Sequence, residues 1–218
     1  MDEDLIPLVP EATVARLPVY LRGLGDLASD GVDTVSSEQL AAAAGVNAEN
    51  VRKDLSILGS YGKRGVGYEV DFLIEQIKRV LGAGAPVSVV IVGAGNLGRA
   101  LTHYGGFASG GFPIKGLVDS SSEVIGKEIA GITIEPFEKL SDVVEKNNCT
   151  LGIIATPASS AQMVADQLVA AGIYSILNFA PGLVTVPETV TLRKVDLATE
   201  LHILAFHEQQ RERNGEVK

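Results

Sequence analysis

The chain has 218 residues, of which 46% are hydrophobic, and its formal net charge is −9. This length favours one medium-sized and one small domain, and the negative charge argues against general adhesion to nucleic acid, so any DNA binding has to be local. The acidic start, the lack of an apolar run near the ~20 residues of a membrane span, and the single cysteine, Cys149, lead us to expect a cytoplasmic protein with no disulfide and no cysteine-based metal site.

Residues 1 to about 80 have the pattern of a small helical domain. The first helix is predicted over residues 12–24, where apolar positions recur at helical spacing: Val14, Leu17, Leu21 and Leu24. Pro18 lies within this segment and is tolerable only near a first turn or as a kink. Further on, Ser36 is followed by Gln39, a capping box that predicts the start of a second, short helix.

A third helix follows closely and completes a helix-turn-helix. Gly45 ends the short helix, Asn47 is a candidate cap for the next one, and an apolar stripe runs along that helix: Val51, Leu55 and Leu58. Two short helices joined by a glycine-containing turn are typical of this motif. Polar side chains of this third helix lie off the apolar stripe, available to a DNA major groove: Asn50, Arg52, Lys53 and Ser56.

A glycine-rich segment comes next. Residues 61–68 read Tyr-Gly-Lys-Arg-Gly-Val-Gly-Tyr, too rich in glycine for a helix, and we interpret them as a tight β wing. With Lys63 and Arg64, the window 47–68 is locally basic within an acidic chain. A charge cluster on a solvated helix is the alternative. The order of helix-turn-helix, basic helix and basic wing favours DNA binding, and we assign residues 1–80 to a winged-helix DNA-binding domain.

Strands and helices alternate from residue 86 onward, after a helix over 72–81 and a linker at 82–86. Strands are predicted over 87–92, 114–118, 132–134, 151–155 and 175–178, with 189–195 as a candidate last strand, and helices over 97–104, 138–146 and 160–171. This alternation predicts an α/β fold with a doubly wound parallel sheet, and we assign residues 86–195 to a Rossmann-like domain.

A final amphipathic helix is predicted over residues 197–212. Its apolar residues need a partner surface: Leu197, Leu201, Leu204 and Phe206. Periodicity alone does not decide whether that surface belongs to the same domain or to another subunit.

The first strand of the second domain opens directly into Gly93-Ala94-Gly95-Asn96-Leu97-Gly98, and Asp119 closes the next strand. A lone GxGxxG is weak evidence, but a strand before it, a helix after it and an acid roughly 20 residues on form a dinucleotide-binding signature. The glycines allow a tight turn and close approach of the backbone to a pyrophosphate. Asp119 suits a free 2′-hydroxyl and repels a 2′-phosphate, so NAD(H) is expected rather than NADP(H).

Two further segments follow predicted strands and so lie at the same end of the sheet. Thr156 and Pro157 follow one strand, and Phe179 follows another, where its ring is a candidate wall for a nicotinamide pocket. Ordinary turn chemistry accounts equally well for the prolines and small residues of these segments.

No general acid or base for a dehydrogenase stands out. His103 lies on the helix behind the glycines, and His202 and His207 lie off a common helix face, so neither a catalytic nor a zinc pair is supported. We expect Cys149 to behave as a small buried hydrophobe. A small NAD-dependent oxidoreductase with an accessory helical domain is the alternative function, and a nucleotide-sensing scaffold that binds protein through the last helix is a third.

Several of these segments, in their order, resemble the Rex family of bacterial redox-sensing transcriptional repressors. The resemblance covers nearly the whole chain and is carried by residues 35–37, 45–47, 51–55, 62–68, 93–98 and 178–181. Ser121 and Ser122 depart from the acidic or prolyl residues often found there in the family, which puts the ribose contacts in doubt and not the function.

The resemblance implies a homodimer with a winged-helix domain, a Rossmann domain and a C-terminal segment, residues 196–218, whose helix is exchanged between subunits. It implies a repressor and not an enzyme, which holds operator DNA when NADH is scarce and releases it when NADH binds. NADH and NAD+ are then regulatory ligands. It also implies that Arg16, Tyr104 and Asp196 link the ligand site to the DNA-binding domain, although from the residues alone these are ordinary surface polar groups.

Overall fold

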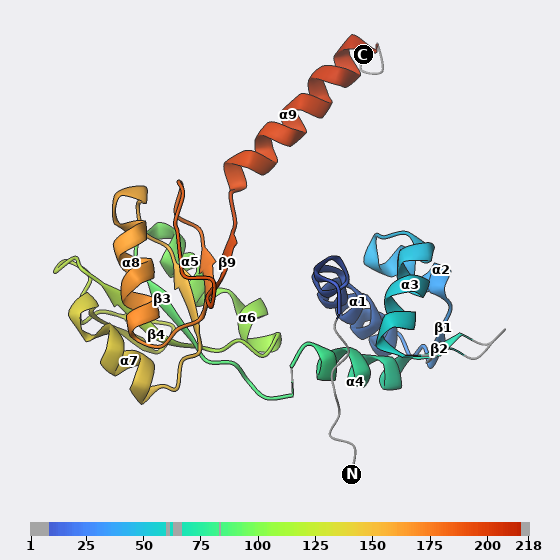
Figure 1. Ribbon diagram of the computed structural model, residues 1–218, viewed down its shortest axis with the longest axis horizontal. Coiled ribbons are helices and arrows are strands. Elements are labelled where there is room, and N and C mark those ends of the chain that lie inside the picture. Colours follow the sequence, from blue (N-terminus) through green and yellow to red (C-terminus); the bar gives the residue numbers. More distant parts are fainter. Residues whose placement is uncertain (1–8, 60–61, 63–66, 83, 215–218) are drawn as a thin grey trace. The chain divides into compact units, whose positions relative to one another are not determined.

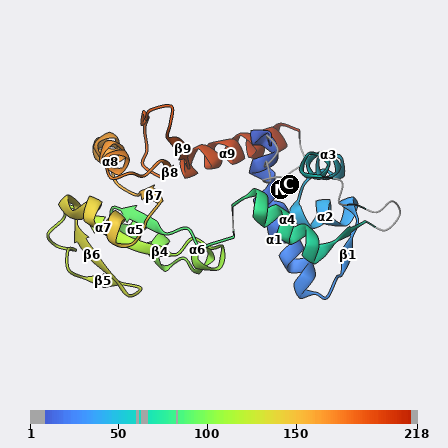
Figure 2. The same cartoon turned by 60° about the horizontal axis from the view of Figure 1, so that its bottom comes forward.

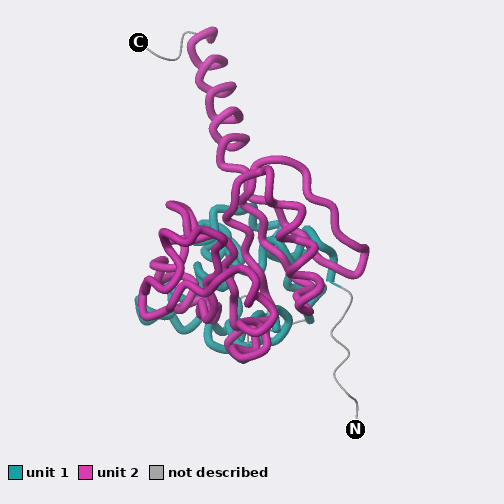
Figure 3. Tube along the Cα trace, turned by 90° about the vertical axis from the view of Figure 1, so that its left-hand side faces the viewer, with its two compact units in different colours: residues 1–85 teal, residues 86–218 magenta. Residues whose placement is uncertain are grey.

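The computed structural model describes residues 9–59, 62, 67–82 and 84–214 (Figure 1). The chain divides into two compact units, Met1–Ala85 and Pro86–Lys218 (Figure 3). The first unit is mainly helical and the second contains an extended sheet, so each has its own core.

Unit 1 is built from helices α1 (Glu11–Ser29), α2 (Ser37–Ala44), α3 (Ala48–Leu58) and α4 (Val70–Val80). Helix α1 packs against α2 and α4, and α3 packs against α2. Strands β1 (Thr34–Val35) and β2 (Tyr68–Glu69) form a small antiparallel sheet. The largest fully buried side chains of the unit come from all four helices: Leu17, Tyr20, Leu24, Leu40, Leu55, Leu73 and Ile77.

The predicted helix-turn-helix is confirmed down to its caps. Ser36 Oγ accepts a hydrogen bond from the Gln39 amide at 3.2 Å, and the Ser36 amide donates to Gln39 Oε1 at 2.8 Å, which is a complete capping box. Gly45 ends α2 with a φ of 64°, the left-handed region that favours glycine. Asn47 Oδ1 accepts from the Glu49 amide at 2.7 Å and caps α3.

Helix α1 differs from its prediction in length and in the face that it buries. It continues through Pro18, which is exposed. The buried face includes Thr13, Leu17, Tyr20 and Leu24, whereas Val14 is 40% exposed. The buried face of α1 is therefore rotated from the one that the apolar spacing predicts. Thr13 takes one of the buried positions because its hydroxyl bonds to the buried Asp54.

The predicted wing falls largely outside the described residues. Tyr61, Lys63 and Arg64 are among the residues that are not described, while Tyr68 in β2 pairs with Val35 in β1. Strand β1 was not predicted, because two residues are too short a run to show periodicity.

Unit 2 has a seven-stranded sheet in the order β5-β6-β4-β3-β7-β8-β9 (Figure 2). The strands are β3 (Val89–Val92), β4 (Ile114–Asp119), β5 (Glu128–Ile129), β6 (Ile132–Pro136), β7 (Leu151–Ile154), β8 (Ser175–Asn178) and β9 (Thr191–Lys194). All neighbours are parallel except β5 and β6, which form a hairpin. The predicted α/β fold with a parallel, Rossmann-like sheet is confirmed, and the two-residue strand β5 was missed.

The helices of unit 2 are α5 (Asn96–His103), α6 (Gly105–Ser109), α7 (Leu140–Lys146), α8 (Ala158–Ala170) and α9 (Leu197–Arg213), with a 3-10 turn at Phe137–Lys139. Strand β3 is buried on both faces: Val90 and Val92 belong to the core with α7 and α8, and Val89 and Ile91 to the core on the other face. Because β4 and β7 flank β3 on opposite sides, the chain reverses its winding direction at β3, which is where doubly wound sheets bind ligands.

Candidate functional sites

The turn after β3 is shaped by two glycines that have no room for a side chain. Gly93 has a φ of 104°, and a Cβ atom there would lie 2.6 Å from the carbonyl oxygen of Ala155. A Cβ atom on Gly98 would overlap the carbonyl oxygen of Gly93. These two glycines are therefore required by the fold itself, since they let β3, the turn and α5 pack closely.

Gly95 is different, because its surroundings are open. It is the N-terminal cap of α5 and has a φ of −69°, which alanine also adopts, and no atom lies within 4 Å of a Cβ built on it. Gly95 stands at the N-terminus of α5, where the first amide groups of a helix have no partner within the helix, and such an N-terminus suits a phosphate. Packing within the described chain therefore does not require a glycine at this position.

Asp119 is held against this turn by backbone amides. Its Oδ2 accepts a hydrogen bond from the Ala94 amide at 2.6 Å, and its Oδ1 accepts from the Ser121 amide at 2.7 Å. The carboxylate is thus fixed at the end of β4 and ties that strand to the glycine turn. Each oxygen keeps a further lone pair for a ligand hydroxyl.

A pocket of about 180 Å³ lies at this end of the sheet, and several of the predicted residues line it: Gly93, Gly95, Asp119, Thr156 and Pro157. Thr156 Oγ1 is buried and makes no hydrogen bond with any residue that the structure describes. A buried hydroxyl without a hydrogen-bond partner is unusual, because burying it costs desolvation free energy. A ligand that forms a hydrogen bond with it would offset that cost. An open glycine, a fixed carboxylate and an unsatisfied hydroxyl together fit a dinucleotide.

The other predicted ligand residues are not part of the pocket lining. Asn96 and Leu97 form the first turn of α5, and Ala94 is buried beneath it. Phe179 is half-buried and packs with the core cluster on the α5 face of the sheet, which also contains Ala94. Its predicted contact with a nicotinamide ring stays a prediction.

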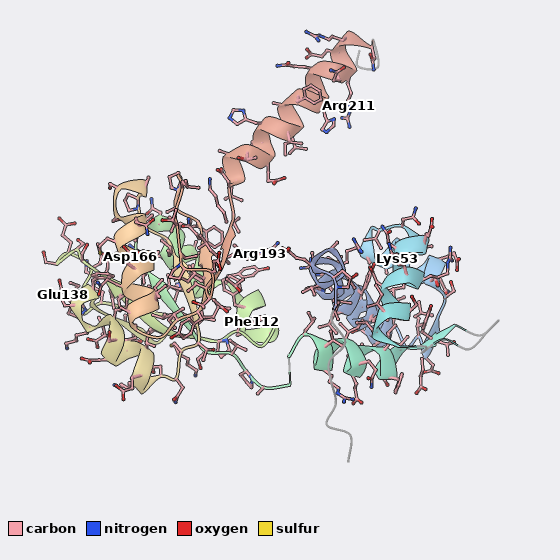
Figure 4. The ribbon with its side chains drawn as sticks, in the orientation of Figure 1. Lys53, Phe112, Glu138, Asp166, Arg193 and Arg211 are labelled. Atoms are coloured by element: carbon pink, nitrogen blue, oxygen red, sulfur yellow. The ribbon has the colours of Figure 1, made fainter. Side chains whose placement is uncertain are left out.

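The predicted DNA-reading side chains share the exposed face of α3. Asn50, Arg52, Lys53 and Ser56 are all exposed, and Figure 4 labels Lys53. Arg52 Nη1 donates to Glu38 Oε1 of α2 at 2.7 Å. The other two predicted contacts, Lys63 and Arg64, lie outside the described residues.

Beneath this face lies a buried carboxylate that the sequence interpretation missed. Asp54 of α3 is completely buried and accepts hydrogen bonds from three side chains of α1, at 2.8 Å from Thr13 Oγ1, 2.6 and 2.7 Å from Arg16 Nε and Nη2, and 2.7 Å from Tyr20 Oη. Burial raises the pKa of Asp54, but the hydrogen bonds from Arg16, Tyr20 and Thr13 outweigh it, so the pKa lies below its ordinary value.

A sequence signal for this site existed. Asp54 falls on the same helix face as Val51, Leu55 and Leu58, so the apolar stripe contains one acidic residue. An acid at a buried position needs donors, which was a reason to search for them.

The three residues proposed to link the two units are each engaged within their own unit. Arg16 pairs with Asp54. Tyr104 is 58% exposed and packs edge-to-face on Phe107. Asp196 pairs with Lys194 at 3.0 Å and accepts from the Thr199 amide at 3.2 Å, capping α9. The hydrogen bond from Lys194 is the main cause that lowers the pKa of Asp196.

Helix α9 has no buried residue, and its large apolar side chains are exposed: Leu197, Leu201, Ile203, Leu204 and Phe206. The sheet of unit 2 also has an uncovered apolar area, a cavity of about 260 Å³ whose lining includes Phe107, Phe112, Ile153 and Leu177. Figure 4 labels Phe112. Neither surface is covered by the other described elements of unit 2.

The remaining candidate groups form no reactive cluster. His103, His202 and His207 are exposed, and no three metal-binding side chains of the described residues come close enough to hold an ion. Cys149 is buried, and burial raises the pKa of its thiol to about 11. Within the described ranges no helix is long and apolar enough to cross a membrane.

Comparison with known proteins gives matches over both units. Residues 8–56 match a family described as putative DNA-binding protein N-terminus, and residues 85–182 match the CoA binding domain family. A relative named redox-sensing transcriptional repressor Rex from Streptomyces avermitilis is 58% identical over 203 residues, which cover 93% of this chain and 81% of the relative.

Solved structures of a protein called RSP, a Rex-family repressor, have the same fold. The crystal structure of RSP in complex with β-NAD+ and operator DNA matches with a TM-score of 0.87 at 34% identity, covering 96% of each chain. The complex of RSP with β-NADH has a TM-score of 0.84, also at 34% identity, and covers 97% of this chain and 99% of that one.

Proposed function

The chain belongs to the Rex family of redox-sensing transcriptional repressors, and on that premise we propose that it is a repressor that binds operator DNA and releases it when NADH binds. It is a regulator and not an enzyme, as its named relatives are. Operator DNA and the nicotinamide pool are both cytoplasmic in a bacterium, so we place its action there.

The observation that carries the proposal is the pocket at Gly95 and Asp119. The pocket has room for a phosphate at the N-terminus of α5, a carboxylate fixed for a ribose diol and a buried hydroxyl, Thr156 Oγ1, that needs a partner. Asp119 disfavours a 2′-phosphate, which selects NAD(H) over NADP(H). We assign the other predicted ligand contacts, Ala94 and Pro157 among them, to the same site.

The DNA-binding surface is proposed on α3. The four residues of α3 that were predicted to read DNA are exposed, and Lys53 carries no ion pair in the described structure, so its ammonium is available to a base edge or phosphate. Unit 1 with the wing is then the DNA-binding domain, over residues 1–80. Residues 86–195 are the ligand-binding domain.

We propose that the protein is a homodimer in which α9, within residues 196–218, packs on the partner subunit. Two uncovered apolar surfaces support this: the side chains of α9 and the cavity on the sheet of unit 2. Burying the face of α9 that carries Leu197, Leu201 and Leu204 there would remove these exposed side chains from water. A two-fold dimer reads half-sites spaced by about one helical turn, ~34 Å.

Coupling between the sites is proposed to run through Arg16, Tyr104 and Asp196, which the family resemblance points to. The test is operator binding, measured by fluorescence anisotropy on a palindromic site with and without saturating NADH. We expect NADH to weaken binding roughly 5 to 150-fold, the usual range for allosteric coupling. Operator binding that NADH leaves unchanged would refute the proposal, and turnover of an oxo or hydroxy substrate would favour the oxidoreductase alternative.

A further inference from the structure

We infer that Asp54 is a positioning residue that makes the recognition helix α3 move with Arg16, so that the ligand signal reaches the DNA-reading face through this carboxylate. The inference deepens the proposed function and rests on it, because Arg16 is one of the residues proposed to link the two units.

The geometry gives Arg16 a two-point hold on α3. Its Nε and Nη2 donate to the two different oxygens of Asp54, at 2.6 and 2.7 Å. This paired arrangement fixes the plane of the guanidinium as well as its distance, which a single hydrogen bond does not do. A rotation of the Arg16 side chain therefore changes both bonds at once.

The Nη1 end of the Arg16 guanidinium is available to a hydrogen-bond acceptor outside this cluster. The Arg16 side chain is 28% exposed while the Asp54 side chain is 0% exposed, and no residue in the described part of the chain accepts a hydrogen bond from Nη1. Arg16 thus has an inner side that holds the recognition helix and an outer side that a second acceptor is able to reach.

The carboxylate cannot stay behind if Arg16 moves. Its other donors, Thr13 and Tyr20, are neutral hydroxyls, and Arg16 is the cation that compensates the buried charge. Removing the cation leaves an uncompensated buried anion, which is far more costly than bending a helix slightly. Asp54, and with it α3, is expected to follow the guanidinium.

Stability alone does not explain an ion pair at this position. Replacement of a buried ion pair by apolar side chains is often neutral or stabilising. Helix α3 already buries Val51, Leu55 and Leu58, so a fourth apolar residue at position 54 would complete its stripe. Asp54 instead accepts four hydrogen bonds from side chains of α1, and these bonds fix the position of α3 relative to α1.

The test uses Asp54→Asn in the full chain, a change that keeps the size, removes the charge and replaces one acceptor oxygen by an NH2 group, so that the paired hold of Arg16 is broken. The quantity measured is the factor by which saturating NADH weakens operator binding. We expect this factor to fall to less than a third of the parent's value, while NADH affinity without DNA stays within twofold. Tyr20→Phe is the matched control, because it removes a neutral donor to the same carboxylate and leaves the Arg16 pair intact; its factor should equal the parent's.

A purely structural role predicts a different result. Asp54→Asn would then weaken operator binding equally with and without NADH, and the factor by which NADH weakens operator binding would be unchanged. With a parent that responds to NADH, this result would overturn the inference and leave the proposed function standing. A parent that does not respond to NADH would refute the proposed function and this inference with it. If Asp54→Asn does not fold, hydrogen exchange of the parent decides. NADH should change the protection of α3 amides around Asp54, and unchanged protection there would overturn the inference.

Discussion

Asp54 in unit 1 and Asp119 in unit 2 are both carboxylates held by several short hydrogen bonds, but the donors are of different kinds. Asp119 is held by two backbone amides at the mouth of a pocket. Asp54 is held by the side chains of Thr13, Arg16 and Tyr20 inside a helical core. Asp119 is still able to accept hydrogen bonds from a ligand, whereas the oxygens of Asp54 are occupied by protein donors.

The difference indicates what each acid is able to do. Backbone amides position Asp119 without using all its lone pairs, so it can accept ligand hydroxyls without rearrangement of the fold. The donors of Asp54 belong to another helix, so any change at Asp54 changes how α1 and α3 sit together. The first arrangement suits recognition of a ligand and the second suits transmission of a movement.

The largest expected effect comes from Asp54→Ala. Removal of one partner of a buried ion pair lowers the free energy of unfolding by about 3–5 kcal/mol, because the charge of the other partner stays buried without a counter-charge. Hydrogen exchange of α1 and α3 amides should report that loss in unit 1 and little change in unit 2. A loss below about 1 kcal/mol would contradict the view that Asp54 joins these helices.

Acid provides a check on the same pair. The pKa of Asp54 is lowered in the folded chain, so its stabilisation is present above its unfolded pKa, about 3.9, and is lost as the pH falls through the folded value. Protection of α1 and α3 should therefore fall below about pH 4 in the parent. Asp54→Asn, which has no charge to lose, should show a shallower fall.

Gly95→Ala tests the ligand side of the comparison. A Cβ atom at Gly95 enters open space and the backbone there suits alanine, so the melting temperature should be unchanged. The added methyl occupies the space for a pyrophosphate, and NADH affinity should fall ~100-fold or more, about 2.7 kcal/mol. Calorimetric titration with NADH measures it.

Gly98→Ala is the contrasting variant, because its Cβ atom overlaps the carbonyl oxygen of Gly93. It should lower the melting temperature of unit 2 as well as NADH affinity. Tight NADH binding by Gly95→Ala would mean that the phosphates lie elsewhere.

A smaller effect is expected for Asp119→Asn. The change removes the charge and one of the two acceptor oxygens, so the hydrogen bonds to ribose hydroxyls should lose about 1.5–3 kcal/mol, roughly 10 to 150-fold in NADH affinity. Asp142→Asn is the control, since Asp142 is an exposed acid of α7 outside the pocket lining, and the NADH affinity of this variant should stay within about twofold. An unchanged affinity in Asp119→Asn would show that other residues hold the ribose.

The same contrast explains what could be predicted from the sequence. The glycine turn, Asp119 and the caps at Ser36 and Asn47 follow from local patterns, because each depends on residues a few positions away or on a motif of fixed spacing. The Asp54 cluster joins residues 34 to 41 positions apart, and no spacing rule links such partners.

Other omissions have equally physical causes. Strands β1 and β5 have two residues each, too few to show alternation. Thr13 takes a buried position on α1 that hydrophobicity assigns to an apolar residue, because its partner is Asp54. Which surface covers α9 is a question of assembly, and periodicity indicates only that a cover is needed.

The central claim, that the ligand and DNA sites are coupled, is tested most directly by measuring NADH affinity in the absence and presence of operator DNA. Coupling free energy is reciprocal, so DNA must weaken NADH binding by the same factor by which NADH weakens DNA binding. We predict equal factors within error in the parent, between roughly 5 and 150-fold. An NADH affinity that saturating operator DNA leaves unchanged would contradict the account.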